Sequence, residues 1–458
     1  MVSIWPINTK RIAGEVEVGG CSVTAIAQNY GTPIFVLDEG DFKARISNWQ
    51  SEFKAAFNEN AGEIFYAAKS FISVEIAKII NHSGIGLDVC TGGELAVARA
   101  ANFPGERIEM HGNNKSEKEI EAAIDYRVGV IVLDSLQEIE RVARIAHGKN
   151  RVQKVVIRLN PGVEAHTHEY IATAHEDVKF GFSIATGGAW DALLSVVKHE
   201  SLQLIGVHCH IGSQIFATDA YQASAIRLLE FLARYKAEFG TELENLNVGG
   251  GIGIAYTEED TPMSAKAFLA TINNVIVKES ARIGISVPKI SIEPGRALVG
   301  PSMITLYTVG TTKEVQLENG ATRLYVSVDG GMSDNIRTSL YGAVYTAEIA
   351  NRVSTAQLRN CRIVGKHCET GDIVINEIEL PSDISPGDLL AVPATGAYGR
   401  SMASNYNHVP RPGVISVAAG AARTIIRSET EIDLLALDVD EAPKKLEKLP
   451  NRESGARK

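Results

Sequence analysis

Lys69 is the residue whose type and position point most directly to chemistry. It ends the apolar run in FYAAKSF, and burial at the end of a strand is expected to lower the pKa of an ammonium group. The resulting neutral amine can condense with an aldehyde. Most lysines instead keep their charged end in water at the surface. Lys69 by itself therefore does not decide between a nucleophile and a surface residue.

A glycine-rich turn is the candidate phosphate site. Gly249, Gly250 and Gly251 follow one another, so backbone amides can approach phosphate oxygens without side chains in between. Ser213 can add a hydroxyl, and the turn made by Gly295 and Arg296 can add further amides. A tight turn between a strand and a helix would also need glycines. The pattern is not GxGxxG and does not indicate a dinucleotide.

Two histidines allow two interpretations. His208 and His210 are spaced i, i+2, so on a strand both would point the same way, as metal ligands do. His166 and His168 repeat this spacing. A metal-dependent barrel hydrolase is therefore the rival from a different class, although no acidic ligand has a recognised spacing. In the other interpretation, the flat imidazole of His210 stacks on a pyridine ring.

Glu293 follows another apolar run, in KISIEPG. A carboxylate below a pyridine nitrogen keeps that nitrogen protonated and strengthens the ring as an electron sink. The plainer interpretation of EPGR is a strand-ending turn with a surface ion pair. Together with Lys69 and the glycine turn, Glu293 fits a phosphorylated aromatic cofactor that bonds to an amine.

Eight short apolar runs between about residues 32 and 296 position these groups. Each is followed by a turn and a stretch of helical periodicity, and the runs end at Lys69, Cys90, Asn113, Ser135, Pro161, Ser213, Gly251 and Gly295. Apolar strands that alternate with helices predict a parallel sheet. Eight of them predict a closed (βα)8 barrel of the TIM type, an α/β fold whose active site lies at the C-terminal ends of the strands.

Helix-start signals and a change in residue pattern after Pro301 define the predicted domains. Three S/T-x-x-E patterns predict capping boxes directly after strands, at Thr91 and Glu94, Ser116 and Glu119, and Ser135 and Glu138. After Pro301 the segments are β-branched and alternating, which predicts a mainly antiparallel β domain. We therefore expect N-terminal strands that join the β domain (1–34), a barrel (35–300), the β domain (301–440) and a flexible charged tail (441–458).

Composition narrows the class of protein. The net charge of −10 over 458 residues argues against a general nucleic-acid binder. The five cysteines are odd in number and form no CxxC pair, which favours reduced thiols over a disulfide framework. No run reaches the length of a membrane span, and the N-terminus has no apolar signal region. We expect a cytoplasmic protein with no membrane and no nucleic-acid partner.

Several long motifs occur in order over nearly the whole chain. They are FYAAKS, HGNNK, HCHIGSQ, NVGGGIGIAY, SIEPGRALVGPS, DGGMSDNIRTSLYGA, KHCETGDI and ATGAYGRSMASNYN. The set resembles the diaminopimelate decarboxylase family, which belongs to the alanine-racemase-like, barrel-type class of pyridoxal-phosphate enzymes. The block PGVEAHTHEYIATAHEDVKFGF is similar to actinobacterial members. Asp88 lies in a CTGGE context where the family more usually has SGGE, and Thr91 can still cap the helix.

The resemblance implies a role for each site residue and no metal. For the cofactor it implies Lys69 as the Schiff-base lysine, His210 against the ring, Glu293 at the ring nitrogen, Asp88 at the second strand end, and Ser213, Gly249, Gly250, Gly251, Gly295, Arg296 and Tyr398 around the phosphate. For the substrate it implies Arg296, Arg337, Tyr341, Glu369 and Tyr398. Cys368 and Glu369 are expected to enter the neighbour's site in a head-to-tail homodimer. Cys368 or Lys69 is the catalytic residue expected to return a proton to the substrate carbon.

The implied reaction is the conversion of meso-2,6-diaminopimelate to L-lysine and carbon dioxide, the last step of lysine biosynthesis. Two arginines and a tyrosine would bind the carboxylate at the far end of the substrate. The related ornithine and arginine decarboxylases have CD where this chain has Cys368 and Glu369. A decarboxylase for another diamino acid is the nearest alternative. A non-catalytic protein of the same fold is the further one, against which the presence of Lys69 and Cys368 counts.

Overall fold

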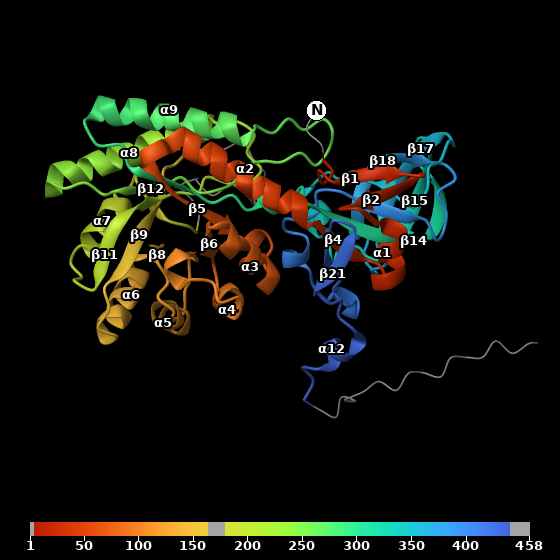
Figure 1. Cartoon of the computed structure of the whole chain (residues 1–458), viewed down its shortest axis with the longest axis horizontal. Helices are drawn as coiled ribbons and strands as arrows, with labels where there is room; N and C mark the ends of the chain where they lie inside the picture. The colour runs from red at the N-terminus through yellow and green to blue at the C-terminus, as the bar shows by residue number, and fades with distance from the viewer. Residues whose placement is uncertain (1–3, 164–178, 440–458) are drawn as a thin grey trace, which may run out of the picture.

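A βα barrel and a β domain lie next to each other in the computed structural model, which describes residues 4–163 and 179–439 (Figure 1). His166, His168 and the predicted tail at 441–458 lie outside the described residues. No helix in the described ranges is both long and apolar enough to cross a bilayer.

The barrel forms from the eight apolar runs, as predicted. In the described chain its parallel strands are β5 (Ala61–Ala67), β6 (Gly86–Val89), β7 (Ile108–Met110), β8 (Val130–Leu133), β9 (Gln153–Asn160), β11 (Leu202–His208), β12 (Asn245–Asn247) and β13 (Lys289–Ile292). Pairing of β13 with β5 and of β8 with β9 closes the ring. A two-residue strand, β10 (Phe182–Ser183), pairs in parallel with the end of β9.

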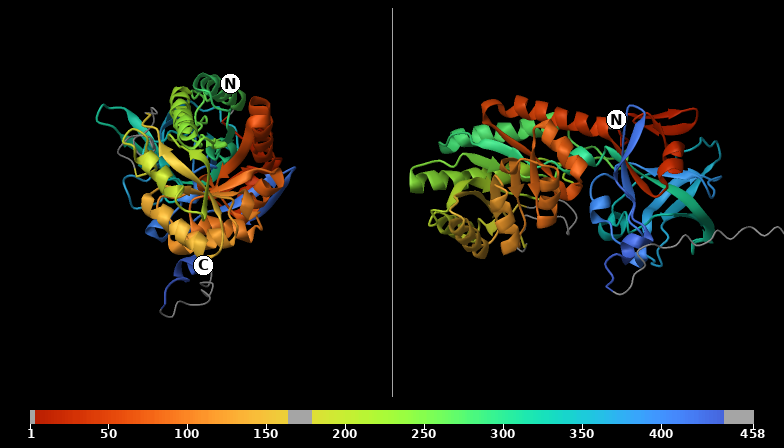
Figure 2. Two further views of the ribbon diagram at one scale, coloured as in Figure 1. Left: turned by 90° about the vertical axis from the view of Figure 1, so that its left-hand side faces the viewer. Right: turned by 60° about the horizontal axis from the view of Figure 1, so that its bottom comes forward.

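Helices cover the outside of the strand ring, as the end-on view in Figure 2 shows. They are α2 (Glu39–Phe57), α3 (Val74–Ser83), α4 (Gly92–Ala100), α5 (Glu117–Asp125), α6 (Leu136–Gly148), α7 (Gly188–Val196), α8 (Asp219–Phe239) and α9 (Ala265–Ile283). On α6, Ile139, Val142, Ala143 and Ala146 follow the helical period and are buried. Each helix therefore packs its apolar stripe against the strands.

The three predicted helix caps are present, but only one is a reciprocal box. Ser116 accepts from the Glu119 amide, and the Glu119 carboxylate accepts from the Ser116 amide at 2.9 Å. The carboxylates of Glu94 and Glu138 instead accept from the amides of the residues before the caps, at 2.6 and 2.8 Å. Glu94 and Glu138 thus tie a strand end to the helix that follows, whereas Glu119 binds its own cap and the Gly92 amide of the neighbouring helix.

The β domain is mainly antiparallel, as predicted, with two parallel pairs. Its long sheet has the order β18 (Ile373–Pro381), β17 (Leu358–Val364), β15 (Thr322–Val328), β14 (Met303–Gln316), β4 (Ile34–Asp38), β20 (Gly413–Ala418) and β21 (Ala421–Ile426), and β19 (Leu389–Val392) pairs with β14 and with β16 (Glu348–Ile349). The pairs β15–β17 and β4–β20 are parallel. Short helices α10 (Arg296–Val299), α11 (Arg337–Tyr341) and α12 (Glu431–Leu435) complete the described elements after the barrel.

The N-terminal segment belongs with the β domain. Strands β1 (Thr9–Ile12), β2 (Glu15–Val18) and β3 (Cys21–Ser22) form a small antiparallel sheet, and helix α1 (Val23–Tyr30) follows. Its apolar side chains share a core with residues of β4, β14 and β20. Strand β4 falls almost wholly within the block expected to form the barrel, 35–300, yet it pairs with β14 and β20. The chain thus enters the barrel only at α2, and the predicted domain limits stay a prediction.

Candidate active site

A cavity of about 400 Å³ lies at the C-terminal ends of the barrel strands, where the β domain faces them. Barrel and β-domain residues both line it, among them Lys69, His210, Ser213, Arg337, Tyr341 and Tyr398. A narrow extension beneath it is bordered by Glu293, Gly251, Gly295 and Arg296. Most of the residues predicted from separate motifs therefore meet in one place.

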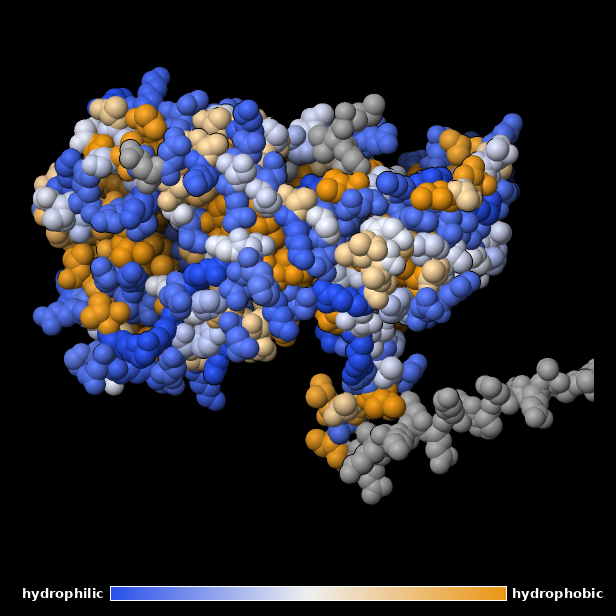
Figure 3. Space-filling model, viewed as in Figure 1, coloured by the Kyte–Doolittle hydropathy of each residue, from blue (hydrophilic) through white to orange (hydrophobic). Residues whose placement is uncertain are grey.

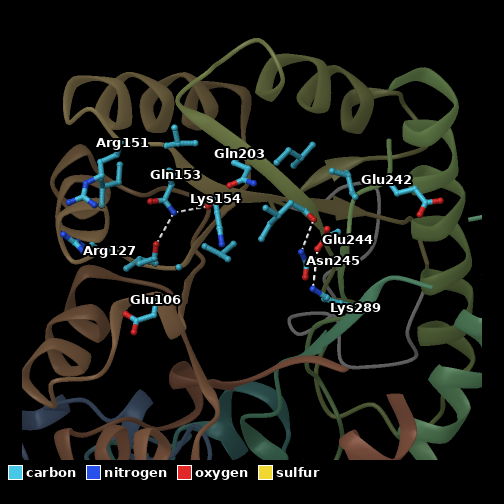
Figure 4. Close-up of a pocket in the computed structure, with 18 residues that line it drawn as sticks. Glu106, Arg127, Arg151, Gln153, Lys154, Gln203, Glu242, Glu244, Asn245 and Lys289 are labelled. Carbon is cyan, nitrogen blue, oxygen red and sulfur yellow. Dashed lines mark hydrogen bonds and ion pairs between the residues drawn. The ribbon is translucent and has the colours of Figure 1, made fainter. Parts of the chain in front are cut away.

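A larger hollow of about 680 Å³ opens at the other end of the barrel, between the N-terminal ends of the strands (Figure 4). Its lining includes charged residues such as Arg127, Arg151, Lys154 and Glu244. None of the predicted site residues lines it. Because barrel enzymes react at the C-terminal face, the smaller cavity is the candidate active site.

Lys69 follows β5 in a short turn and reaches the cavity, but its charge differs from the prediction. Burial does lower its pKa, as expected, yet the acidic groups Tyr398, Cys90, Asp88 and Glu293 more than offset this and raise it above the usual lysine value. The prediction of a neutral amine is therefore wrong for the ligand-free chain. Lys69 is an ammonium there and must lose a proton before it bonds an aldehyde.

The glycine turn is required by packing and also borders the extension. A methyl group at Gly250 would overlap the carbonyl oxygen of Glu293, and Gly249 has a φ of +73°. Close packing and backbone shape therefore already require these two glycines. Gly251 has a φ of +101°, and a methyl group there would overlap the carbonyl oxygen of Gly212, so it meets the same constraints; it also borders the narrow extension together with Gly295 and Arg296. The surroundings of the extension fit a phosphate group, since small residues and a guanidinium meet there.

Arg296 and Arg337 are buried in the cavity wall and rest on tyrosines. Arg296 donates to Ser213 Oγ at 2.8 Å and to the Tyr256 hydroxyl, and its guanidinium carbon lies 4.7 Å from the centre of the Tyr398 ring. The guanidinium carbon of Arg337 lies 4.6 Å from the centre of the Tyr256 ring. Among the described residues no carboxylate forms an ion pair with either arginine. The wall thus presents two cations that have no ion-pair partner among the described residues.

Tyr256 and Tyr345 are site residues that the sequence analysis missed. Tyr256 lines the cavity, and the Tyr345 hydroxyl accepts a hydrogen bond from Arg337. Tyr256 ends the NVGGGIGIAY motif, and Tyr345 follows the motif that contains Arg337. Their presence in or beside these motifs was the available signal, but no spacing rule connects residues of two domains.

The two histidines of HCH belong to different groups. Strand β11 ends at His208, so the alternation that would have aligned the pair stops there. His210 lines the cavity, and its Nδ1 accepts from the Gly250 amide at 3.4 Å. Burial, together with the charges of Lys69 and Arg158, lowers the pKa of His210, so its ring is neutral. His208 instead meets His111 and Glu293 below the cavity, with ligand atoms within 4.8 Å of one another.

Asp88 lies beneath the cavity and does not line it. It is buried at the end of β6, where Cys90 Sγ and His111 Nε2 both lie 3.8 Å from its Oδ1. Burial raises its pKa to about 7. Its carboxyl therefore acts on the site through its neighbours, and it is one of the groups that raise the pKa of Lys69.

Cys368 and Glu369 are exposed and do not line the cavity of their own chain. The Cys368 amide donates to Asn407 Oδ1 at 2.9 Å, and Glu369 Oε2 accepts from the Tyr406 hydroxyl at 3.4 Å. These contacts fix the loop that carries both residues after β17.

Comparisons with known proteins agree with this geometry. Residues 39–300 match the family model described as "Pyridoxal-dependent decarboxylase, pyridoxal binding domain". The chain is 50% identical over 442 residues to diaminopimelate decarboxylase of Mycobacterium tuberculosis, covering 95% of this chain and 98% of that one. It is 44% identical over 426 residues to the enzyme of that name from Bacillus subtilis, covering 93% and 95%.

A solved structure extends the agreement to the fold. The diaminopimelate decarboxylase of M. jannaschii, crystallised in complex with L-lysine, superposes with a TM-score of 0.88 at 30% identity, covering 95% of this chain and 98% of that one. The match includes both the barrel and the β domain. This protein belongs to the diaminopimelate decarboxylase family of pyridoxal-phosphate-dependent enzymes.

Proposed function

We propose that this chain decarboxylates meso-2,6-diaminopimelate at its D-configured centre and releases L-lysine and carbon dioxide, with pyridoxal phosphate as cofactor. The high identity over nearly the whole chain supports the activity. When bound, pyridoxal phosphate supplies an aldehyde that bonds the substrate amine and a ring that accepts the electron pair left by carbon dioxide.

The single observation that carries the substrate assignment is the pair of buried arginines without carboxylate partners. Arg296 is 6% exposed and Arg337 is 5% exposed. A buried charge that lacks a partner is strongly destabilising, so a cavity with two of them is built for anionic ligands. One anion is the cofactor phosphate, and the second is the far carboxylate of a dicarboxylic substrate.

The remaining polar groups divide between cofactor and substrate. Lys69 bonds the cofactor, His210 offers its neutral ring as a stacking face, and Glu293 binds the ring nitrogen. The phosphate is held by Ser213, Gly249, Gly250, Gly251, Gly295, Arg296 and Tyr398, while Asp88 acts through the layer below. Arg296, Arg337, Tyr341 and Tyr398 hold the substrate.

We propose that Cys368 and Glu369 complete the site of a second copy of the chain. Both are exposed, although the reaction needs a proton donor and the far ammonium needs an acid. Apolar residues beside them and beside the cavity mouth are exposed too: Tyr406 at 41%, Leu340 at 42% and Val344 at 64%. Exposed apolar side chains also gather at α12 and just after it (Figure 3), including Leu437. A homodimer would cover such surfaces.

One experiment separates this proposal from its rivals. The purified chain is incubated with meso-, LL- and DD-diaminopimelate, ornithine and arginine, and carbon dioxide and the amine product are measured. Rapid release from the meso isomer with L-lysine as product supports the proposal. Preference for ornithine or arginine would favour another diamino-acid decarboxylase, and inactivity with all five substrates would favour a non-catalytic relative.

The metal-dependent alternative was based on the spacing of His208 and His210, which lie in different groups of the structure. Treatment with a chelator distinguishes the two classes. Activity that survives chelation but is lost on borohydride reduction belongs to the pyridoxal-phosphate enzyme. Loss on chelation alone would instead indicate the metal-dependent class.

A further inference from the structure

A buried polar layer lies directly beneath the cavity, inside the barrel. It consists of Asp88, Glu109, His111, His208, Asn247 and Glu293, which come from the ends of five strands, and none is more than 4% exposed. The interior of such a barrel is normally packed with branched apolar side chains. Burying six polar groups in this place destabilises the fold unless each is paired with another group.

Three nitrogen atoms of this layer surround one oxygen of Glu293, and the one from Asn247 donates a hydrogen bond to it. His208 Nε2 lies 2.9 Å, Asn247 Nδ2 2.8 Å and His111 Nε2 3.2 Å from Oε1. No hydrogen bond from the described residues ends on Oε2. Glu293 also borders the narrow extension that leads to Lys69 and His210. The carboxylate is thus fixed through one oxygen and keeps the other for a ligand.

Asn247 connects this carboxylate to the glycine turn. Its Nδ2 donates both to Glu293 and to Glu109 Oε2, the latter at 2.9 Å, and its Oδ1 accepts from the Gly249 amide at 2.9 Å. Both amide hydrogens and the amide oxygen are therefore used. The side chain holds the ring-nitrogen carboxylate and the turn above it in one fixed geometry.

The charges of the layer agree with this arrangement. Burial lowers the pKa of His111, but Asp88, Glu293 and Glu109 raise it to about 10, so the ring is an imidazolium. Burial raises the pKa of Glu293, but His208 and His111 more than reverse this and hold it well below the usual value. His208 is neutral, because burial lowers its pKa to about 4. Glu293 stays a carboxylate although it is buried.

We propose that Asn247 and His111 are positioning residues, which hold Glu293 so that its free oxygen meets the ring nitrogen of the cofactor. The proposal rests on the proposed function, because it assumes that pyridoxal phosphate occupies the cavity. It assigns a task to two residues that do not touch the substrate and that act through Glu293. If the two residues only supported the barrel, replacing them would change the affinities for different cofactors equally.

A cofactor analogue tests this difference. In 1-deaza-pyridoxal phosphate a carbon replaces the ring nitrogen, while the aldehyde and the phosphate are unchanged. Dissociation constants of both compounds are measured by absorption titration of the full-length chain. We expect the wild type to bind pyridoxal phosphate more tightly than the analogue by about tenfold or more, as for a hydrogen bond to a charged group.

The variant Asn247→Asp has almost the same shape but replaces the amide donor by a carboxylate. We expect it to lose about tenfold or more in affinity for pyridoxal phosphate, and to bind the analogue as the wild type does. Asn245→Asp is the matched control, because Asn245 lies on the same strand and donates at 3.1 Å to the Ile205 carbonyl oxygen at the far end of the barrel. That variant should keep the wild-type preference between the two cofactors.

His111→Gln is an independent second variant, which removes the imidazolium. If Asn247→Asp does not fold, the affinities of His111→Gln for the two cofactors test the proposal. An equal loss of affinity for both cofactors, or no loss for either, would overturn the proposal. So would a wild type that binds both compounds equally well. A wild type that binds neither compound and has no decarboxylase activity would show that the proposed function itself fails.

Discussion

Replacing Arg337 tests the substrate assignment at its physical basis. The side chain is buried, donates to the Tyr345 hydroxyl, and lies on the Tyr256 ring with no carboxylate partner among the described residues. Arg337→Met keeps a long side chain in the same space and removes the charge and the donors. If Arg337 binds the far carboxylate, only substrates that carry this carboxylate should be affected strongly.

The magnitude follows from the environment of the guanidinium. Removal of one partner of a charged contact from which water is excluded costs about 2–5 kcal/mol. Since about 1.4 kcal/mol corresponds to a factor of ten in rate, kcat/KM for meso-diaminopimelate should fall about 30-fold or more. The slow background reaction with L-lysine or ornithine, which lack the second carboxylate, should change far less.

The assay measures carbon dioxide release from each substrate for the wild type and two variants. Arg362→Met is the matched control, because Arg362 lies 5.7 Å from the centre of the Tyr325 ring and donates to its hydroxyl at 3.4 Å, outside the cavity. It removes the same kind of contact without reaching the site. Its kcat/KM should stay within about twofold of the wild-type value, as for an ordinary surface substitution.

Thermal unfolding gives the second readout for Arg337→Met. Replacing a buried charge that lacks a counter-ion by an apolar side chain is often neutral or stabilising, so the ligand-free variant should unfold at the wild-type temperature or above it. A lower unfolding temperature combined with equal losses on all substrates would refute the reasoning. Arg337 would then support the fold, and the diaminopimelate assignment would lose its main physical argument, although the decarboxylase class would stand.

Three further predictions concern the lysine, the assembly and acid stability. Lys69→Ala should abolish decarboxylation and the visible band of the bound cofactor while the circular dichroism of the fold is unchanged; wild-type activity would exclude this lysine as the cofactor's partner. Mixing inactive Lys69→Ala with inactive Cys368→Ala chains should restore activity through hybrid dimers, and no recovery despite measured subunit exchange would mean that each chain carries a complete site. Burial raises the pKa of Glu39, but hydrogen bonds from Lys43, Ser416 and Arg423 lower it to about 2. The Glu39 carboxylate therefore stabilises the fold at pH values above 4.5, its pKa in the unfolded chain, and this stabilisation is lost as the pH falls toward 2. The free energy of unfolding in urea should therefore be lower for Glu39→Gln than for the wild type at about pH 6, and this difference should narrow at about pH 3; a difference that is the same at both would exclude the carboxylate as its source.

The barrel was predictable because its signals are local. Each strand is a short apolar run, and each cap is read from four consecutive residues, such as Ser116 to Glu119. A closed parallel barrel then brings the ends of all strands to one face. Lys69 and His210 could be assigned to one cavity without any knowledge of side-chain contacts.

What the sequence could not predict depends on contacts between distant segments. Strand β4 is a short apolar run like the barrel strands, but it pairs on its two sides with β14 and β20, which lie far along the chain. Tyr256 and Tyr345 come from different domains, and their rings pack edge to face, 5.2 Å between centres, beside Arg337. The charge of Lys69 was predicted with the wrong sign of shift, because burial is visible in an apolar run whereas the surrounding acids come from other strands.

The distribution of charge connects these findings. The upper wall of the cavity carries Arg296 and Arg337 without acidic partners among the described residues, and the layer below holds Glu293 as a carboxylate. Pyridoxal phosphate has the opposite polarity, with an anionic phosphate and a ring nitrogen that becomes cationic on protonation. A site that was rigid but electrically neutral could hold the same shape, yet it would not protonate the ring. Under the proposed function, the chain contributes to the reaction by maintaining this separation of charge in a buried space, and the ligands complete the neutralisation.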